Sequence, residues 1–170
     1  PSGIPYDTLK PEDLPVVSLW GEVIDGDLKP SSETPMHTAI FRARANVNGV
    51  VHTHSMYATV MSIMQKEIPA MVPPSSAFAP VPCAPFQLPG SKELAETVVA
   101  TLGEDHLACT MQNHGQITCA PTLAMAYKGA ETVEECAQIA YLAYQAGSMQ
   151  GLPEDARVEL RRRALKGQAV

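Results

Sequence analysis

The sequence predicts a single α/β domain in which short strands and helices alternate along the chain. Its 170 residues suit one domain with one hydrophobic core, and 45% apolar against 18% charged residues is an ordinary balance for a soluble protein. Several segments place apolar residues at helical spacing, and short apolar runs bounded by turn residues lie between those segments.

The first part of the chain predicts strands, then a helix, then another strand. Residues 14–28 hold short apolar runs and the turn residues Asp25-Gly26, so we expect strands there. Thr34-Pro35 is a helix start, and the apolar spacing that follows predicts a helix over residues 34–45. A turn at residues 46–49 then leads into an apolar run that predicts a strand.

The middle of the chain predicts two helices separated by a long loop. Apolar spacing indicates a helix over residues 56–65. Residues 69–90 contain seven of the 15 prolines, which predicts an extended loop with a short strand near residues 81–84. A helix over residues 91–102 follows, and Ser91 is its expected N-cap.

The last part predicts a hairpin and two helices. Short strands are expected at residues 107–111 and 116–119, and they meet at Asn113-His114-Gly115. The longest helix is expected over residues 121–147, where small and apolar residues form a stripe of helical period. A charged helix is expected over residues 153–166.

The overall charge argues against two classes of partner. The formal net charge is −6, and an acidic surface attracts neither nucleic acid nor anionic membranes. The one basic run, Arg161-Arg162-Arg163, is interpreted as a solvated face or an oligomer contact, with a phosphate contact as the alternative. We therefore expect no nucleic-acid partner and no membrane partner.

Further features predict a cytoplasmic protein with reduced cysteines. No apolar run reaches the roughly 20 residues of a membrane span, and no signal peptide is recognisable at the N-terminus. The four cysteines form no CxxC pair, so we interpret them as small core residues. The chain starts at Pro1 without a methionine, and we expect that a preceding segment is missing.

His52 and His54 are the most informative residues. Their two-residue spacing in a strand places both imidazoles on one face. His114 lies at the expected strand corner, and Glu33 supplies a carboxylate upstream. Three imidazoles and one carboxylate suit a catalytic zinc site that leaves a position for substrate oxygens. The alternative is a set of exposed or hydrogen-bonded histidines without a metal.

Two further histidines stay outside this predicted set. His37 lies one helical turn after Glu33 and could orient its carboxylate, but a structural role is favoured. His106, beside Asp105, is expected at the surface.

Two serine motifs are candidates for anion binding. Ser31-Ser32 precedes a helix start, where hydroxyls and backbone N–H groups can hold a phosphate without net positive charge. Ser2-Gly3 could add another hydroxyl and backbone donor. The alternatives are a helix cap for the first motif and a simple turn for the second.

Taken together, four motifs resemble those of the class II aldolase/adducin family, and of its L-fuculose-phosphate aldolases in particular. Their order and spacing agree across most of the chain, and the resemblance fades in the C-terminal tail. The motifs are Pro1-Ser2-Gly3-Ile4-Pro5-Tyr6, Lys29-Pro30-Ser31-Ser32-Glu33, Val51-His52-Thr53-His54-Ser55 and Asn113-His114-Gly115.

The resemblance implies a metal-dependent aldolase. Zinc would be bound by His52, His54 and His114, and manganese or cobalt would also suit such ligands. Glu33 would lie near or on the resting metal and act as acid/base during turnover. The expected reaction cleaves a phosphorylated ketose, similar to L-fuculose 1-phosphate, to dihydroxyacetone phosphate and an aldehyde through a metal-stabilised enediolate.

The resemblance also implies a phosphate site, a fold and an assembly. Ser2, Gly3, Ser31 and Ser32 match the family's phosphate-binding positions. The implied fold is a three-layer α/β/α sandwich around a largely antiparallel sheet, formed by residues 1–170 as one domain that lacks its N-terminal segment. The implied assembly is a homotetramer with active sites at subunit interfaces, acting on a small phosphorylated sugar.

The chain departs from the family pattern in ways that leave other activities open. Aldolases of this kind use tyrosines in the loop after an Ile-Pro-Ala motif, here Ile68-Pro69-Ala70, and in the C-terminal tail. In this chain, residues 69–82 and the residues after Tyr144 contain no tyrosine. The related L-ribulose-5-phosphate 4-epimerases typically have Asp where Glu33 stands. Sugar-acid phosphate decarboxylases or dehydratases are further alternatives, as is a non-enzymatic adducin-like interaction module, which the three histidines disfavour.

Overall fold

The structure is a computed structural model that describes residues 1–167. Its centre is a four-stranded sheet in the order β3-β6-β5-β4. β6 pairs antiparallel with both of its neighbours, and β4 pairs parallel with β5. The strands are β3 (Gly49–Thr53), β4 (Cys83–Ala84), β5 (Ala108–Met111) and β6 (Gly115–Ala120). The sheet is therefore mostly antiparallel, which confirms the predicted sheet type.

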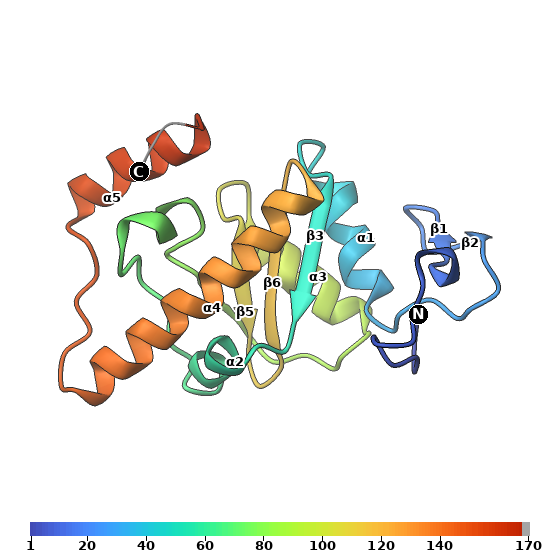
Figure 1. The fold of residues 1–170 in the computed structure, drawn as a ribbon, viewed down its shortest axis with the longest axis horizontal. Coiled ribbons are helices and arrows are strands. Elements are labelled where there is room, and N and C mark those ends of the chain that lie inside the picture. Colours follow the sequence, from blue (N-terminus) through green and yellow to red (C-terminus); the bar gives the residue numbers. More distant parts are fainter. Residues whose placement is uncertain (168–170) are drawn as a thin grey trace.

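Helices cover both faces of this sheet (Figure 1). One face is crossed by α4 (Leu123–Gln145), which packs on β3 and β6 and on α2 (Met56–Ile63). The other face carries α1 (Thr34–Ala43) and α3 (Lys92–Leu102), which pack against each other. The arrangement is the predicted α/β/α sandwich. None of the helices in the described part of the chain is long and apolar enough to cross a membrane.

Two peripheral units lie at opposite ends of the molecule (Figure 1). At one end, η1 (Pro11–Asp13) precedes a small antiparallel pair, β1 (Val16–Val17) and β2 (Val23–Asp25). At the other end, α5 (Glu154–Leu165) packs on η2 (Pro73–Ala77), the 3-10 turn within the proline-rich loop.

The arginine run on α5 corrects part of the sequence interpretation. Arg162 and Arg163 form exposed ion pairs with Glu159. Arg161 is half-buried instead, and its guanidinium donates hydrogen bonds to the backbone oxygens of Ala77 and Asp105. The prediction of a solvated face is therefore wrong for Arg161, because this side chain anchors α5 to the rest of the domain.

The core lies between the sheet and its two helical layers. Every residue of β5 and β6 is buried, as expected for strands covered on both faces. Cys109, Cys119 and Cys136 are buried, which confirms the predicted core position for these three, whereas Cys83 is half-buried. The predicted N-cap at Ser91 is also confirmed, because Ser91 Oγ accepts a hydrogen bond from the backbone N of Leu94 at 3.0 Å.

Close contact between β3 and α4 depends on a glycine. An added Cβ at Gly49 would lie 2.5 Å from the backbone N and Cα of Leu123, where α4 begins. This approach keeps α4 against the strand that leads to His52 and His54. A side chain at position 49 would therefore force the two elements apart.

We predict that Gly49→Ala lowers the free energy of unfolding by about 1–3 kcal/mol, because backbone atoms of α4 cannot move aside as a flexible side chain could. Thermal and denaturant unfolding would measure the loss. Asn48→Ala is the matched control, since Asn48 is exposed and contributes its backbone N–H to Ala120 O. Equal stability of the two variants would contradict this prediction.

Candidate metal centre and active site

Three histidines converge at one end of the central sheet. His52 and His54 come from the end of β3, and His114 lies in the turn between β5 and β6. Their ring centroids are 4.8, 4.9 and 5.0 Å apart, so the rings form a nearly equilateral triangle. One nitrogen from each ring lies within 4.8 Å of the others, and the Nε2 atoms of His52 and His54 are 3.1 Å apart. The structure thus brings together the three imidazoles that the sequence predicted.

The backbone explains how His114 reaches the other two rings. β3 pairs with β6 so that Thr53 lies opposite Gln116, which places the end of one strand beside the start of the other. Asn113 adopts a left-handed conformation with φ 57°, a conformation that asparagine tolerates better than most residues. An added Cβ at Gly115 would lie 2.4 Å from Thr53 O and 3.0 Å from His54 Cδ2. Only glycine allows this approach.

His52 is held in one tautomer. Its Nδ1 lies 2.8 Å from the backbone oxygen of Gln116, and a carbonyl oxygen can only accept, so Nδ1 carries the proton. The Nε2 lone pair then faces the other two imidazoles. This arrangement, with one nitrogen hydrogen-bonded and the other free, is typical of metal-binding histidines.

Burial favours the neutral form of His52 and His114, which is the form that binds a metal. Burial lowers the pKa of His52, and the nearby His114 and His54 lower it further, although the hydrogen bond to Gln116 and the charge of Glu33 act in the opposite direction. Burial also lowers the pKa of His114, with a smaller contribution from His54. Neutral imidazole is the ligating form, so these shifts favour a bound cation.

Glu33 lies close to this cluster, at the N-cap of α1. Its negative charge raises the pKa of His52, and its Oε2 is buried without a hydrogen-bond partner in the described chain. His114 Nδ1 is likewise buried without a partner there. The possible ligand atoms of the three histidines all lie within 4.8 Å of one another, and Glu33 does not belong to this set. These donors fit a divalent cation, and the position of Glu33 next to them suits a group that exchanges protons with a bound substrate.

The predicted phosphate-binding residues lie together in part. Ser2 Oγ donates to Pro30 O at 3.0 Å and accepts from the backbone N of Ser32 at 3.2 Å. Ser31 Oγ accepts from the backbone N of Glu33 at 3.1 Å. Gly3 has φ +75°, with open space where a Cβ would project. The structure thus places Ser2-Gly3 beside the start of α1, while phosphate binding by these residues stays a prediction.

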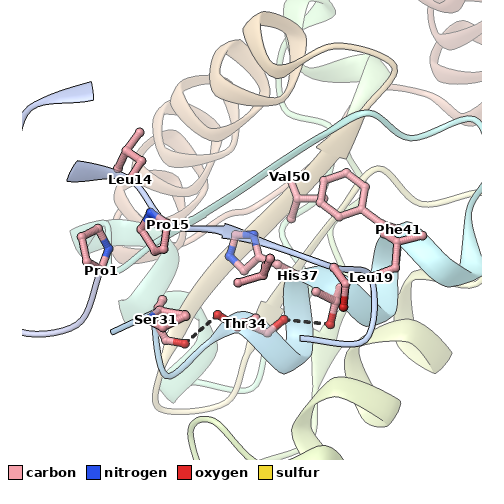
Figure 2. A pocket seen from close by; sticks show the side chains of 13 residues that line it. Pro1, Leu14, Pro15, Leu19, Ser31, Thr34, His37, Phe41 and Val50 are labelled. Atoms are coloured by element: carbon pink, nitrogen blue, oxygen red, sulfur yellow. Dashed lines mark hydrogen bonds between the residues drawn. The ribbon is translucent and has the colours of Figure 1, made fainter. Parts of the chain in front are cut away.

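A cleft of about 720 Å³ lies between the N-terminal segment and α1, and His37 lines it (Figure 2). Burial, with a smaller contribution from His52, lowers the pKa of His37 to about 4. In the described chain no hydrogen bond joins its imidazole to the Glu33 carboxylate, so His37 does not orient that group. His106 is half-buried, contrary to the surface position expected, and its backbone oxygen accepts from Arg44.

Glu134 is a supporting residue that the sequence interpretation missed. Its carboxylate oxygens accept hydrogen bonds from the backbone N atoms of Tyr57 and Ala58, both at 2.9 Å. Glu134 belongs to α4, and the two N–H groups belong to the first turn of α2, directly after His54 and Ser55. A carboxylate at a helix N-terminus is stabilising, and here it fixes the chain that leaves the metal site. No local sequence pattern links residues this far apart.

Comparison with known proteins agrees with this geometry. The model of the Class II Aldolase and Adducin N-terminal domain family matches residues 1–141. A 5-deoxy-D-ribulose 1-phosphate aldolase of Bacillus thuringiensis serovar kurstaki is 42% identical over 156 residues, which are 91% of this chain and 73% of that protein. An L-fuculose phosphate aldolase of Methanococcus maripaludis is 36% identical over 143 residues, which are 84% of this chain and 76% of that protein.

A solved structure shares the fold. An L-fuculose 1-phosphate aldolase superposes with a TM-score of 0.91 at 31% identity, covering 97% of this chain and 78% of the other. The family match spans the sheet, both helical layers and all three clustered histidines. The chain therefore belongs to the class II aldolase and adducin family.

Proposed function

We propose that this metal-dependent class II aldolase, a carbon–carbon lyase, cleaves a ketose 1-phosphate to dihydroxyacetone phosphate and an aldehyde. The observation that carries the proposal is the convergence of His52, His54 and His114 close to Glu33, whose Oε2 is buried. The names of two relatives, a 5-deoxy-D-ribulose 1-phosphate aldolase and an L-fuculose phosphate aldolase, support this substrate class. We take 5-deoxy-D-ribulose 1-phosphate as the first substrate to test, because that relative shares 42% identity.

The three histidines would hold the cation, for which we propose zinc, with manganese or cobalt as alternatives. When bound, such a cation supplies Lewis-acid stabilisation of the negative charge that develops on the substrate oxygens. His52 contributes a lone pair whose direction is fixed by its hydrogen bond to Gln116 O. Burial lowers the pKa of His52 and of His114, which reduces competition between protons and the cation at both rings.

Glu33 would carry the proton transfer at carbon. When the bond between C3 and C4 breaks, the C4 hydroxyl gives up its proton to solvent and becomes the aldehyde carbonyl. The electron pair of the broken bond remains on C3 of the three-carbon fragment, and C3 must then take up a proton. The buried and unpartnered Oε2 of Glu33 is suited to deliver that proton, and to remove it in the reverse direction. We further propose that Ser2, Gly3, Ser31 and Ser32 receive the phosphate, since they lie together beside the N-terminus of α1.

The reaction class is tested with metal-loaded protein on four sugar phosphates. These are 5-deoxy-D-ribulose 1-phosphate, L-fuculose 1-phosphate, L-rhamnulose 1-phosphate and L-ribulose 5-phosphate. We expect dihydroxyacetone phosphate from at least one ketose 1-phosphate, measured with a coupled triose-phosphate assay. Conversion of L-ribulose 5-phosphate without fragmentation would instead identify an epimerase. No product from any of the four would count against the aldolase and favour a decarboxylase or a non-enzymatic module.

The metal site is tested by removing one imidazole at a time. We predict that His52→Ala, His54→Ala and His114→Ala each lose the stoichiometric divalent cation that the unaltered protein retains, because two imidazoles cannot replace the three-ligand set. Elemental analysis after gel filtration measures the metal content. His106→Ala is the matched control, since His106 lies outside the cluster. Full retention of metal by all three variants would contradict the assignment.

The role of Glu33 is tested with Glu33→Gln, which keeps the shape of the side chain and removes its proton affinity. We predict that the cleavage rate falls by about 100-fold or more while the bound metal is retained. NMR measures how fast deuterium from solvent enters dihydroxyacetone phosphate. Loss of this exchange in Glu33→Gln would show that the affected step is the proton transfer at C3. Glu131→Gln, on the exposed side of α4, is the control. Undiminished deuterium exchange in Glu33→Gln would exclude Glu33 as the acid/base.

A further inference from the structure

We propose that the side-chain amide of Gln116 is a positioning residue for the metal ligand His54, which it controls by holding Ser55 in place. The inference rests on the proposed metal-dependent function. Gln116 belongs to β6 and lies two positions after His114. Its side chain is fully buried between the sheet and α4. Its Nε2 donates hydrogen bonds to Ser55 Oγ at 2.7 Å and to Ala130 O at 3.0 Å.

The orientation of this amide is fixed by its partners. A side-chain amide has two N–H donors, and both are used here. Because the backbone oxygen of Ala130 can only accept a hydrogen bond, the amide cannot flip. The main chain of the same residue accepts from His52 Nδ1. Gln116 therefore supports two ligands. Its backbone carbonyl accepts a hydrogen bond from His52, and its side-chain amide holds Ser55, the residue after His54.

His54 is held less by burial than the other two ligands. It is the exposed member of the cluster, whereas His52 and His114 are half-buried. Within residues 1–167, its imidazole is hydrogen-bonded to His52 Nε2 alone. The direction of the ring is therefore set by the backbone at Thr53–Ser55, where the chain leaves β3 and turns into α2. Ser55 is the first residue after His54, and the Gln116 amide fixes it from the neighbouring strand.

The two N–H groups of the Gln116 amide are used, whereas its oxygen is not. Its Oε1 is buried without a hydrogen-bond partner in the described chain, and an unpaired buried acceptor is unfavourable. A methionine of similar length would fill the same space without an unpaired oxygen, but it would lose both hydrogen bonds. Replacement by methionine therefore removes the hold on Ser55 while keeping the volume of the side chain.

Thr118 shows what a purely structural contact looks like in the same place. It lies two residues further along β6, on the same face, and it is also fully buried. Its hydroxyl donates to Ala126 O at 2.7 Å, one helical turn before Ala130 on α4. Thr118 thus ties β6 to α4 as Gln116 does, and its hydroxyl also lies 3.4 Å from Val51 O on β3. In the described chain, however, its side chain makes no hydrogen bond to residues 53–55, which set the direction of His54.

The test compares Gln116→Met with Thr118→Val. Affinity for Zn²⁺ is measured by competition with a chromophoric chelator, and the d–d absorption of the Co²⁺ form reports the ligand geometry. We expect Gln116→Met to weaken Zn²⁺ binding by roughly 10-fold or more and to change the Co²⁺ spectrum, as changes in residues that orient metal ligands typically do. Thr118→Val should lower the thermal stability of the metal-free protein while leaving affinity and spectrum unchanged.

Ser55→Ala removes the same hydrogen bond from its other end. The Ser55 hydroxyl accepts no hydrogen bond from the first turn of α2, so its loss leaves that helix start intact. We expect the single variants to weaken Zn²⁺ binding similarly and the double variant to be no weaker than Gln116→Met alone. This second variant keeps the test decisive if Gln116→Met fails to fold.

The outcomes separate this inference from the proposed function. Unaltered affinity and spectrum in both Gln116→Met and Ser55→Ala, with tight binding by the parent protein, would overturn the positioning role alone. An equal loss of affinity in Thr118→Val would also overturn it, because the effect would then reflect general loosening of β6 against α4. A parent protein that binds no divalent cation would overturn the proposed function and this inference together.

Discussion

The antiparallel pairing of β3 with β6 is the constraint on which the site depends. It places Thr53 opposite Gln116 and so brings the end of one strand beside the beginning of the other. His52 lies one residue before Thr53 on β3, and His54 lies one residue after it. His114 lies just before β6 begins. The close approach is possible only because position 115 has no side chain. A shift of the register by one residue would move His52 to the opposite face and dissolve the cluster.

Much of the fold and the metal ligands could be predicted from local patterns. A strand places alternate residues on one face, so the spacing of His52 and His54 already implied that their rings point the same way. Asn113 and Gly115 around His114 marked a tight corner, and the structure has one there. The cap at Ser91 was visible as a residue type at a helix start. These features depend on neighbours a few positions apart.

The residues that support the site could not be predicted in this way. Glu134 holds the start of α2 from 77 positions away along the chain, and Gln116 holds Ser55 from 61 positions away. Such contacts depend on which helix covers which face of the sheet. Arg161 escaped prediction for the same reason, because its basic neighbours are solvent-exposed while it contacts backbone oxygens of two other segments. Resemblance to a family locates ligands more readily than the particular groups that orient them.

The three imidazoles come from two parts of the chain that meet through the sheet. His52, for example, is 64 positions from Gln116, the β6 residue to which it is hydrogen-bonded. A nascent polypeptide leaving the ribosome has exposed His52 and His54 long before His114 is synthesised. The complete set of three imidazoles therefore exists only after β6 has been added to β3. A cation that needs all three rings meets them in the folded domain and not on the growing chain.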